Sequence, residues 1–415
     1  MSAHSRETLS EPLAMALAHQ GIEAEEPIEP PATTASWAAL VAIGVGAFAL
    51  VTTEFLPVGL LPQIASDMTV TEGQAGLAVT MSGLFAATAA PISIWIAGSL
   101  DRRKVLLFLL GILLIANLIV AMAPSFLMIL LGRVLLGATI GAFWTIAGPL
   151  GPRLKPGPKA GLATAIILSG VSLGTVAGVP VGALIGELVG WRYTFGLSAI
   201  VAVLVLVAIA LLVPPLPVKS SGGLGDLYRV FKNPMVRFGL VGIFLSFVGQ
   251  FAGYTYIAPF LLKIVRVDPP TVSAVLFGFG LVGVAGNILG GWAVGKSLRW
   301  ATAGTLTLLG TSVLLLILLG SYPAAAIPLI LVWGLGFGMQ PIVIQNWMFN
   351  AAPDQLEGVQ AILVSAAQTS IGSGALIGGL LFDQLGLKAA FAAAAVTAFL
   401  TAAMFAALKP SAAGR

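Results

Sequence analysis

The sequence predicts an all-α membrane protein with twelve transmembrane helices arranged as two pseudo-symmetric bundles of six. Of 415 residues, 58% are hydrophobic and 9% charged, and the mean hydropathy is +1.03, which excludes an ordinary soluble domain. Apolar runs of about 20 residues, enough to cross the hydrocarbon core of a bilayer, recur along almost the whole chain. Two sequence motifs also recur about half a chain apart.

Each predicted span is an apolar run that ends at a short polar or Gly/Pro-rich break. The alternating pattern of a membrane β-barrel is absent. The spans are expected near residues 38–62, 75–98, 104–122, 126–150, 160–188, 192–213, 236–262, 272–295, 301–320, 325–350, 358–383 and 388–408.

The longest polar break follows the sixth span and divides the chain into two halves. It contains a flexible SSGG and the segment DLYRVFK, which could form a short basic amphipathic helix on the inner leaflet. The N-terminal segment is acidic and lacks an apolar core, so a disordered tail is expected and not a secretory signal. The predicted organisation is a cytoplasmic tail at 1–36, bundles at 37–213 and 236–408, a cytoplasmic linker at 214–235 and a second cytoplasmic tail at 409–415.

Lys and Arg in the loops predict the orientation. With the N-terminus inside, 15 of the 20 basic residues lie in cytoplasmic segments, four lie outside and one, Arg133, lies within a span. Both termini are therefore expected in the cytoplasm. The net charge of +4 follows from this asymmetry and does not argue for nucleic-acid binding. The chain has no cysteine and both histidines lie in the tail, so no metal site or cofactor is expected in the membrane.

The two halves share sequence patterns. The pattern W-x-x-G-x-x-x-R occurs at 95–102, ending the second span, and at 292–299, ending the eighth, 197 residues later. The pentapeptide GALIG occurs at 182–186 in the fifth span and at 374–378 in the eleventh, 192 residues later. The similar offsets predict two six-helix halves related by an axis along the membrane normal.

Glu54 and Arg133 are the acid and the base placed well inside predicted spans. Each is expected about 10–12 Å from the outward membrane boundary, so the two side chains could meet as a buried ion pair. An unpaired charge at this depth costs at least a few kcal/mol, so each should face the bundle interior or a cavity. One interpretation is a structural tie between the first and fourth spans. The other is a proton switch, in which a site opened to water on either side loads or releases a proton and competes with substrate.

Glycines at four-residue intervals mark the fourth and fifth spans. In the fourth span two glycines follow Arg133 at four and eight residues, and in the fifth span five glycines run from Gly170 to Gly186 at this interval. Small residues at such spacing allow close helix packing. The functional alternative is a surface on which the two halves rock, with Pro180 bending the helix.

At these residues the sequence resembles the drug:proton antiporter branch of the major facilitator superfamily, over residues 37–408. TTEFLPVGLLP resembles the first-span signature of bacterial sugar-efflux and purine ribonucleoside efflux transporters. GRVLLGATIGAFW resembles their fourth-span motif, whose arginine corresponds to Arg133. Gly174, Gly178 and Pro180, followed by GWRYTF, are similar to the fifth-span antiporter motif, although a valine separates the usually adjacent glycine and proline.

The resemblance implies the major facilitator fold and secondary active efflux by alternating access, with protons exchanged for a small organic solute such as a nucleoside, a sugar or a drug-like molecule. Substrate would lie between the halves, and Glu54 with Arg133 would couple the proton. The implied location is a bacterial inner membrane. The expected partners are the solute, protons and the lipid bilayer, without nucleic acid or cofactor, and the chain is expected to act as a monomer.

The loop after the second span departs from the family pattern Gly-x-Leu-Ala-Asp-Arg-x-Gly-Arg-Arg. Here it reads IAGSLDRRKVLL, in which the acid and the final basic pair cannot both be aligned with the pattern. The gate candidates in this loop are Asp101, Arg102 and Arg103, and those in the fifth span are Gly174, Gly178 and Pro180.

Polar and aromatic residues within the other spans indicate the kind of ligand. Each alone is as compatible with helix packing as with a site. Together they offer stacking surfaces and neutral hydrogen-bonding groups, which suit an uncharged, planar or polyhydroxylated solute. The segments around Gln250 and Trp347 resemble the purine ribonucleoside exporters more than the sugar exporters. The candidate substrate-binding residues are Phe143, Trp144, Gln250, Tyr254, Tyr256, Gln340, Gln345, Asn346 and Trp347.

Three alternatives compete with efflux. A proton-coupled uptake symporter is the nearest, because coupling and not fold sets the direction of transport. A membrane-embedded enzyme would need a histidine, paired acids or a nucleophile with its base inside the spans, and none is evident, so no catalytic residue is expected. A passive channel fits less well with two large halves and a paired charge in the interior.

Overall fold

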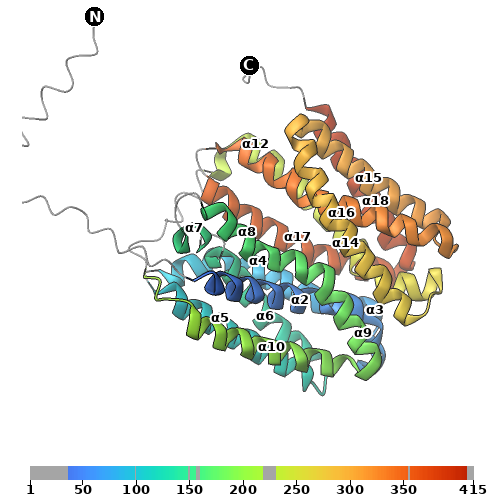
Figure 1. The fold of residues 1–415 in the computed structure, drawn as a ribbon. Coiled ribbons are helices and arrows are strands. Elements are labelled where there is room, and N and C mark those ends of the chain that lie inside the picture. The colour runs from blue at the N-terminus through green and yellow to red at the C-terminus, as the bar shows by residue number, and fades with distance from the viewer. Residues whose placement is uncertain are drawn as a thin grey trace, which may run out of the picture. The chain divides into compact units, whose positions relative to one another are not determined.

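The structure, a computed structural model, describes residues 36–98, 100–147, 150–155, 159–217, 230–353 and 356–408. Within these residues every regular element is helical (Figure 1), and twelve helices are long and apolar enough to cross a membrane. The predicted fold class is confirmed. Except for Ser36, the two predicted tails lie outside the described residues, and so does most of the predicted linker. Of the predicted amphipathic segment only residues 230–232 are described, and they are helical.

The described helices follow the predicted spans closely. The first six spans are α2 (Trp37–Met68), α4 (Leu77–Ala97) preceded by α3 (Glu72–Ala75), α5 (Arg102–Ala121), α6 (Phe126–Ala147), α8 (Ala160–Leu173) continued by η2 (Gly174–Gly178) and α9 (Val179–Val189), and α10 (Trp191–Leu212). The last six are α12 (Pro234–Tyr254) continued by α13 (Ile257–Phe260) and η3 (Leu261–Val265), α14 (Pro269–Lys296), α15 (Leu298–Leu319), α16 (Pro323–Ala351), α17 (Leu356–Leu385) and α18 (Leu387–Ala407). A short helix, α7 (Leu150–Leu154), follows α6.

The first helix is longer than predicted. It continues through Pro57 and Pro62 to Met68, past the predicted end at residue 62. A proline inside a span is tolerated when neighbouring helices bind the carbonyl that it leaves free. At Pro57 the free carbonyl is that of Thr53, and Arg133 of the fourth span binds it.

An internal repeat relates the two halves, with an offset of 196 residues in the first, third, fifth and sixth spans and of 197 residues in the second and fourth. Gly190 begins α10 with φ 101° and Gly386 begins α18 with φ 86°, a left-handed conformation that favours glycine. Arg103 donates a hydrogen bond to a carbonyl near the end of α10, and Arg299 donates to the equivalent carbonyl near the end of α18. Arg299 therefore corresponds to Arg103, and not to Arg102 as the W-x-x-G motif indicated.

The register of the fifth and eleventh spans also differs from the sequence match. Gly178 packs on Thr52 of α2, and Gly374 packs on Val248 of α12, where an added Cβ would lie 2.5 Å from the carbonyl oxygen. Both pairs are related by 196 residues. The GALIG match at 192 residues is therefore one helical turn out of register, because glycines at four-residue intervals make successive turns look alike.

The glycine face of the fifth span packs within the first half. An added Cβ would collide with α2 along its length, from Gly170 against Gly44 to Gly186 against Leu60. The expectation that these glycines form a surface on which the halves rock is therefore wrong. Their close approach to α2 explains why no larger residue occupies the positions.

The halves meet along two seams, one between α4 and α17 and the other between α14 and the η2–α9 segment. In Figure 1, α17 runs alongside α4. The α4–α17 seam is tightest at Gly83, where an added Cβ would lie 2.7 Å from the backbone nitrogen of Gly372. We call the side with the α10–α12 connection (213–233) the linker face, and the side with the α2–α4 connection (69–76) the far face.

Candidate functional site

Arg133 is fully buried between the first, second and fourth spans. Its Nε donates to the carbonyl of Ala78 at 2.7 Å, and Nη1 donates to the carbonyl of Thr53 at 2.7 Å. Its Nη2 donates to the backbone carbonyl of Glu54 at 2.5 Å and to Ser82 Oγ at 3.0 Å. The guanidinium thus joins α2, α4 and α6 through main-chain oxygens and one hydroxyl.

Pro57 explains why α2 offers a carbonyl to this arginine. Proline has no N–H, so the carbonyl of Thr53, four residues earlier, has no partner within the helix. An unsatisfied carbonyl inside a membrane costs several kcal/mol, and Arg133 supplies the missing donor. The TTEFLP stretch therefore places a free acceptor next to the acid Glu54.

The side chain of Glu54 faces the second half of the molecule. Its Oε1 accepts a hydrogen bond from Gln368 Nε2 of α17 at 3.2 Å, and the residue is 3% exposed. Among the described residues, no ion pair joins Glu54 to Arg133. The expected buried ion pair is therefore wrong in this conformation, because the arginine is occupied by the main chain of α2 and the carboxylate is free to contact α17.

Sequence reasoning missed two buried amides that contact this part of α2, Gln368 and Asn117. We call Glu54, Arg133, Gln368 and Asn117 the polar cluster of Glu54. Asn117 Nδ2 donates to Thr53 Oγ1 at 3.5 Å from α5, and Gln368 is 7% exposed with Oε1 lacking a hydrogen-bond partner. Asn117 is an isolated amide in an otherwise apolar span, and Gln368 is an amide in the middle of the eleventh span, so the sequence contains a signal for each.

Gln250 occupies the position in the second half that corresponds to Glu54, 196 residues later. Its Oε1 accepts from Trp333 Nε1 at 3.0 Å, whereas its Nε2 is buried without a partner. The next residues of the repeat, Phe55 and Phe251, stack on each other across the halves with ring centroids 5.8 Å apart. The repeat thus brings an acid and an amide to equivalent depths beside a shared aromatic pair.

Tyr254 lies in the aromatic cluster that surrounds this pair. Its ring stacks on Phe279 with centroids 5.3 Å apart and lies 5.1 Å from Phe337. The cluster supplies flat apolar surfaces next to the unpartnered amide of Gln250. The aromatic cluster consists of Phe55, Phe251, Tyr254, Phe279, Trp333 and Phe337.

Three other predicted substrate residues lie deep in the bundle. Phe143 is fully buried in the first-half core, in edge contact with Trp144 at 5.5 Å. Trp144 is partly buried and packs both against this core and against the core that contains the aromatic cluster. Gln340 follows Trp333 by two turns of α16, and its Nε2 is buried without a partner.

The remaining predicted residues of α16 have partners near the linker face. Gln345 donates to Gln360 at 3.1 Å, and Asn346 donates back to the carbonyl one turn earlier in its own helix. Trp347 packs on Phe405 with ring centroids 4.8 Å apart. The structure does not bring these three side chains together with Gln250, because they lie in the last two turns of α16.

Tyr256 belongs to the closure of the far face. Its hydroxyl donates to the carbonyl of Ala375 at 2.8 Å and lies 3.4 Å from the carbonyl of Gly73. Asp383 of α17 accepts from Thr71 Oγ1 at 2.6 Å and from the backbone N–H of Gly73 at 3.1 Å. These contacts join the two halves, so in this conformation Tyr256 contributes to the closure of the far face and lies apart from the other predicted substrate residues.

An ion pair adds to this closure. Lys263 Nζ lies 2.7 Å from Glu72 Oε2, which links η3 to the start of α3. With the contacts of Tyr256 and Asp383, it closes the far face between the halves.

The loop candidates for a gate make their contacts within the first half. Asp101 Oδ1 caps α5 by accepting from the N–H of Arg103 at 2.8 Å, and it also accepts from the N–H of Leu216 at 3.0 Å. Arg102 donates to the carbonyl of Ala97 at 3.1 Å, and Arg103 donates to the end of α10. In this conformation they fasten α4 and α5 to the end of α10.

The fifth-span candidates lie in a segment that borders a seam between the halves, although Gly174 and Gly178 themselves face α2. Gly174–Gly178 form a π-helical turn immediately before α9, whose second residue is Pro180. A π-turn accommodates a residue that cannot donate an α-helical hydrogen bond. Val176 of this turn lies against Gly280 of α14. The turn therefore combines irregular backbone with a contact between the halves.

The match to known proteins agrees with this geometry. The family model described as Major Facilitator Superfamily matches residues 43–373. The chain belongs to the major facilitator superfamily. It is therefore a multi-pass membrane protein of a transporter family, whose class of substrate is a small molecule.

Relatives within the superfamily span almost the whole chain. It is 37% identical over 384 residues to the Pseudomonas aeruginosa protein named transcription regulatory protein OpdE, with 90% of this chain and 95% of OpdE covered. It is 33% identical over 372 residues to the purine ribonucleoside efflux pump NepI of Salmonella paratyphi A, with 90% and 94% covered. The crystal structure of the human organic anion transporter MFSD10 covers 91% of this chain and 100% of its own with a TM-score of 0.64 at 16% identity, a likeness of fold alone.

Proposed function

We propose that the protein is a proton-coupled efflux transporter of a bacterial inner membrane, which exchanges protons for a neutral, planar organic solute. The observation that carries this proposal is the contact between Glu54 and Gln368. It places a buried carboxylate on the seam between the halves, bound to a group that leaves when the seam opens. Intramembrane acids of this kind are typical of proton relays.

The orientation follows from the basic residues. With the linker face in the cytoplasm, 15 of the 20 Lys and Arg residues are cytoplasmic. The far face is then the outer face, and the contacts of Tyr256, Asp383 and Lys263 close the transporter to the outside. The described conformation is one in which exchange with the outside is blocked.

In the proposed proton cycle Arg133 stays in place, while the seam between α4 and α17 opens and closes. Arg133 binds the main chain of α2 at Thr53 and Glu54, which fixes the position of Glu54 within the first half. When the outer face opens, α17 moves from α4, the contact with Gln368 breaks, and outside water protonates Glu54. When the inner side opens, the proton leaves and solute binds. One proton crossing 100 mV contributes about 2.3 kcal/mol, enough at roughly 150 mV to support about a few-hundredfold gradient of a neutral solute.

The unpartnered amide atoms indicate the solute. Gln250 Nε2 is a donor and Gln368 Oε1 an acceptor, and both are buried without partners. The aromatic cluster provides stacking surfaces beside Gln250. A flat neutral solute with both donors and acceptors, such as a purine nucleoside, satisfies these groups. The named substrate class of the relative NepI supports the same choice.

An uptake symporter of the same fold would use the same site, and the direction of proton movement distinguishes it. In vesicles of known orientation that contain the full-length protein, nucleosides, sugars and cationic drugs are screened for solute-induced proton movement. Antiport moves protons against the solute, whereas symport moves them with it. Movement in the same direction would overturn efflux by exchange.

Glu54→Gln tests the proton site. It is expected to abolish accumulation driven by a pH gradient and to preserve exchange of solute between the two sides. The matched control is Glu187→Gln, which changes an exposed acid of the same half that accepts a hydrogen bond from Gln63. Unchanged gradient-driven transport in Glu54→Gln would refute coupling through this residue.

A further inference from the structure

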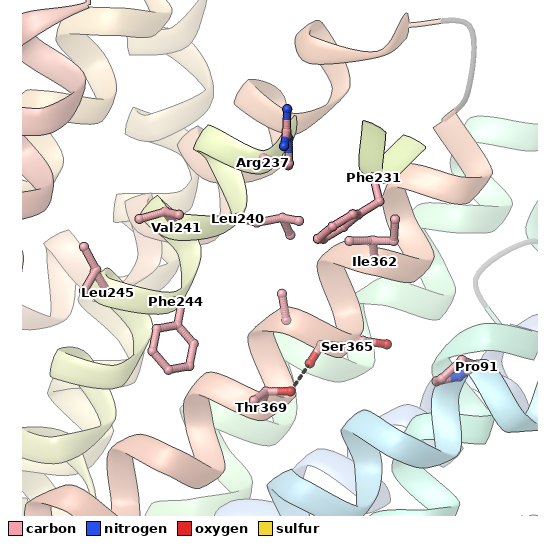
Figure 2. Close-up of a pocket in the computed structure, with 11 residues that line it drawn as sticks. Pro91, Phe231, Arg237, Leu240, Val241, Phe244, Leu245, Ile362, Ser365 and Thr369 are labelled. Atoms are coloured by element: carbon pink, nitrogen blue, oxygen red, sulfur yellow. Dashed lines mark hydrogen bonds between the residues drawn. The ribbon is translucent and has the colours of Figure 1, made fainter. Parts of the chain in front are cut away.

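A groove of about 680 Å³ lies between α12 and α17, with Pro91 of α4 at its edge (Figure 2). Leu240 of α12 and Ile362 of α17 lie on opposite walls of it, and Phe244 and Ala366 also line it. All five residues lie within helices long and apolar enough to cross the membrane. The groove is therefore an apolar recess at membrane depth, outside the polar cluster of Glu54.

Several apolar side chains of the groove walls are exposed on the protein surface. Val241 is 51% exposed and Phe244 is 42% exposed, while Phe231 at the linker-face end is 52% exposed. Apolar side chains at this depth are stable when hydrocarbon covers them. An acyl chain is the hydrocarbon that the bilayer supplies.

A positive charge marks one end of the groove. Arg237 lies in the first turn of α12 at the linker face, and within the described residues its guanidinium has no hydrogen bond or ion pair. Arg229 and Lys232 add positive charge in the preceding sequence. From Arg237 to Leu245 the helix rises about 12 Å, so the charge stands at the membrane surface when the apolar walls lie in the hydrocarbon.

We propose that this groove binds an anionic phospholipid of the cytoplasmic leaflet, with an acyl chain along α12 and α17 and the phosphate at Arg237. The inner leaflet carries anionic headgroups, which basic residues at its surface attract. The guanidinium suits a phosphate because it presents several donors in one plane. The chain would fill the groove between α12 and α17, with Pro91 of α4 at its edge. The assignment uses the orientation proposed above and is independent of proton coupling.

The test uses native mass spectrometry of the full-length protein released from membranes that contain equal phosphatidylglycerol and phosphatidylcholine. Wild type is expected to retain phosphatidylglycerol preferentially. Arg237→Gln should reduce that preference about fivefold, the effect of one basic residue at an anionic surface. The matched control is Lys296→Gln, which removes one positive charge at the linker-face end of α14, where Lys296 lies over Trp292.

A second variant separates the groove from general surface charge. Ala366→Phe leaves the charge unchanged but fills the groove, so retention of both lipids should fall. Retention at the wild-type level in Ala366→Phe, or an equal loss in Lys296→Gln and Arg237→Gln, would overturn the site. Displacement of phosphatidylglycerol by added inosine would make the groove part of the solute path and would also overturn it. Solute exchange by the same preparations reports separately on the transport proposal.

Discussion

The two halves share one scaffold but differ in the chemistry of their central positions. Glu54 in α2 and Gln250 in α12 are related by 196 residues, and the aromatic residues that follow them stack on each other. The acid contacts Gln368 across the seam, whereas the amide contacts Trp333 within its own half. Equivalent positions therefore have different partners, one across the seam between the halves and one inside the second half.

The arginine has no counterpart in the second half. Gly137 packs on the second span as Gly334 packs on the eighth, and these glycines are 197 residues apart. By this offset Arg133 corresponds to Ile330, which is equally buried but apolar. The two halves therefore share their helix packing at these positions. The first half has a buried arginine and the main-chain carbonyls that bind it where the second half has a buried apolar residue.

Moving the acid to the second half should have the largest effect. The double variant Glu54→Gln with Gln250→Glu keeps one carboxylate but places it away from Gln368 and Arg133. The accumulation ratio of solute is expected to fall from about a few-hundredfold toward one, because the proton no longer drives transport. Accumulation in vesicles under an imposed pH gradient measures it. Restored accumulation would show that the two positions are interchangeable.

Removing the arginine should affect stability next. Arg133→Leu leaves the carbonyl of Thr53 without a donor and removes the hydrogen bonds to the carbonyls of Ala78 and Glu54, at a cost of roughly 3–5 kcal/mol. The equivalent change in the other half, Ile330→Leu, should cost less than about 1.5 kcal/mol because it conserves volume in an apolar site. Thermal unfolding midpoints of the purified variants compare the two. Similar midpoints would contradict the asymmetry.

The glycine contacts should respond alike in both halves. Gly178→Ala and Gly374→Ala each force a methyl group against the neighbouring first or seventh span, and each is expected to cost about 1–3 kcal/mol. The same unfolding measurement applies, with Gly304→Ala, a helical glycine with open space around it, as control. A loss confined to one half would show that packing is not repeated.

The smallest effect is expected at Trp333. Trp333→Phe removes the hydrogen bond to Gln250, at about 1 kcal/mol, and leaves the ring in the aromatic cluster. The KM for solute should change, while the accumulation ratio under a pH gradient should not. A collapse of the ratio would mean that the second half also takes part in proton coupling.

Much of the fold could be predicted because the bilayer dictates it. The twelve spans follow from apolar length, and the halves follow from the longest polar break and the repeated motifs. The depth of Glu54 and Arg133 also follows from their places in the spans, and the two residues do meet, though through the main chain. Pro57, four residues after Thr53, already indicates the free carbonyl that the arginine binds.

The partners of each polar group were decided by the tertiary structure. Glu54 contacts Gln368, which is 314 residues away, and Tyr256 reaches the far-face seam instead of the aromatic cluster. Nothing in a single span distinguishes these outcomes, because a side chain inside the membrane takes whichever donor the neighbouring helix presents. The sequence also did not determine the register of the repeat. Glycines at every fourth position allow the fifth and eleventh spans to be aligned equally well one helical turn away. The packing of these spans against α2 and α12 selects the offset of 196 residues.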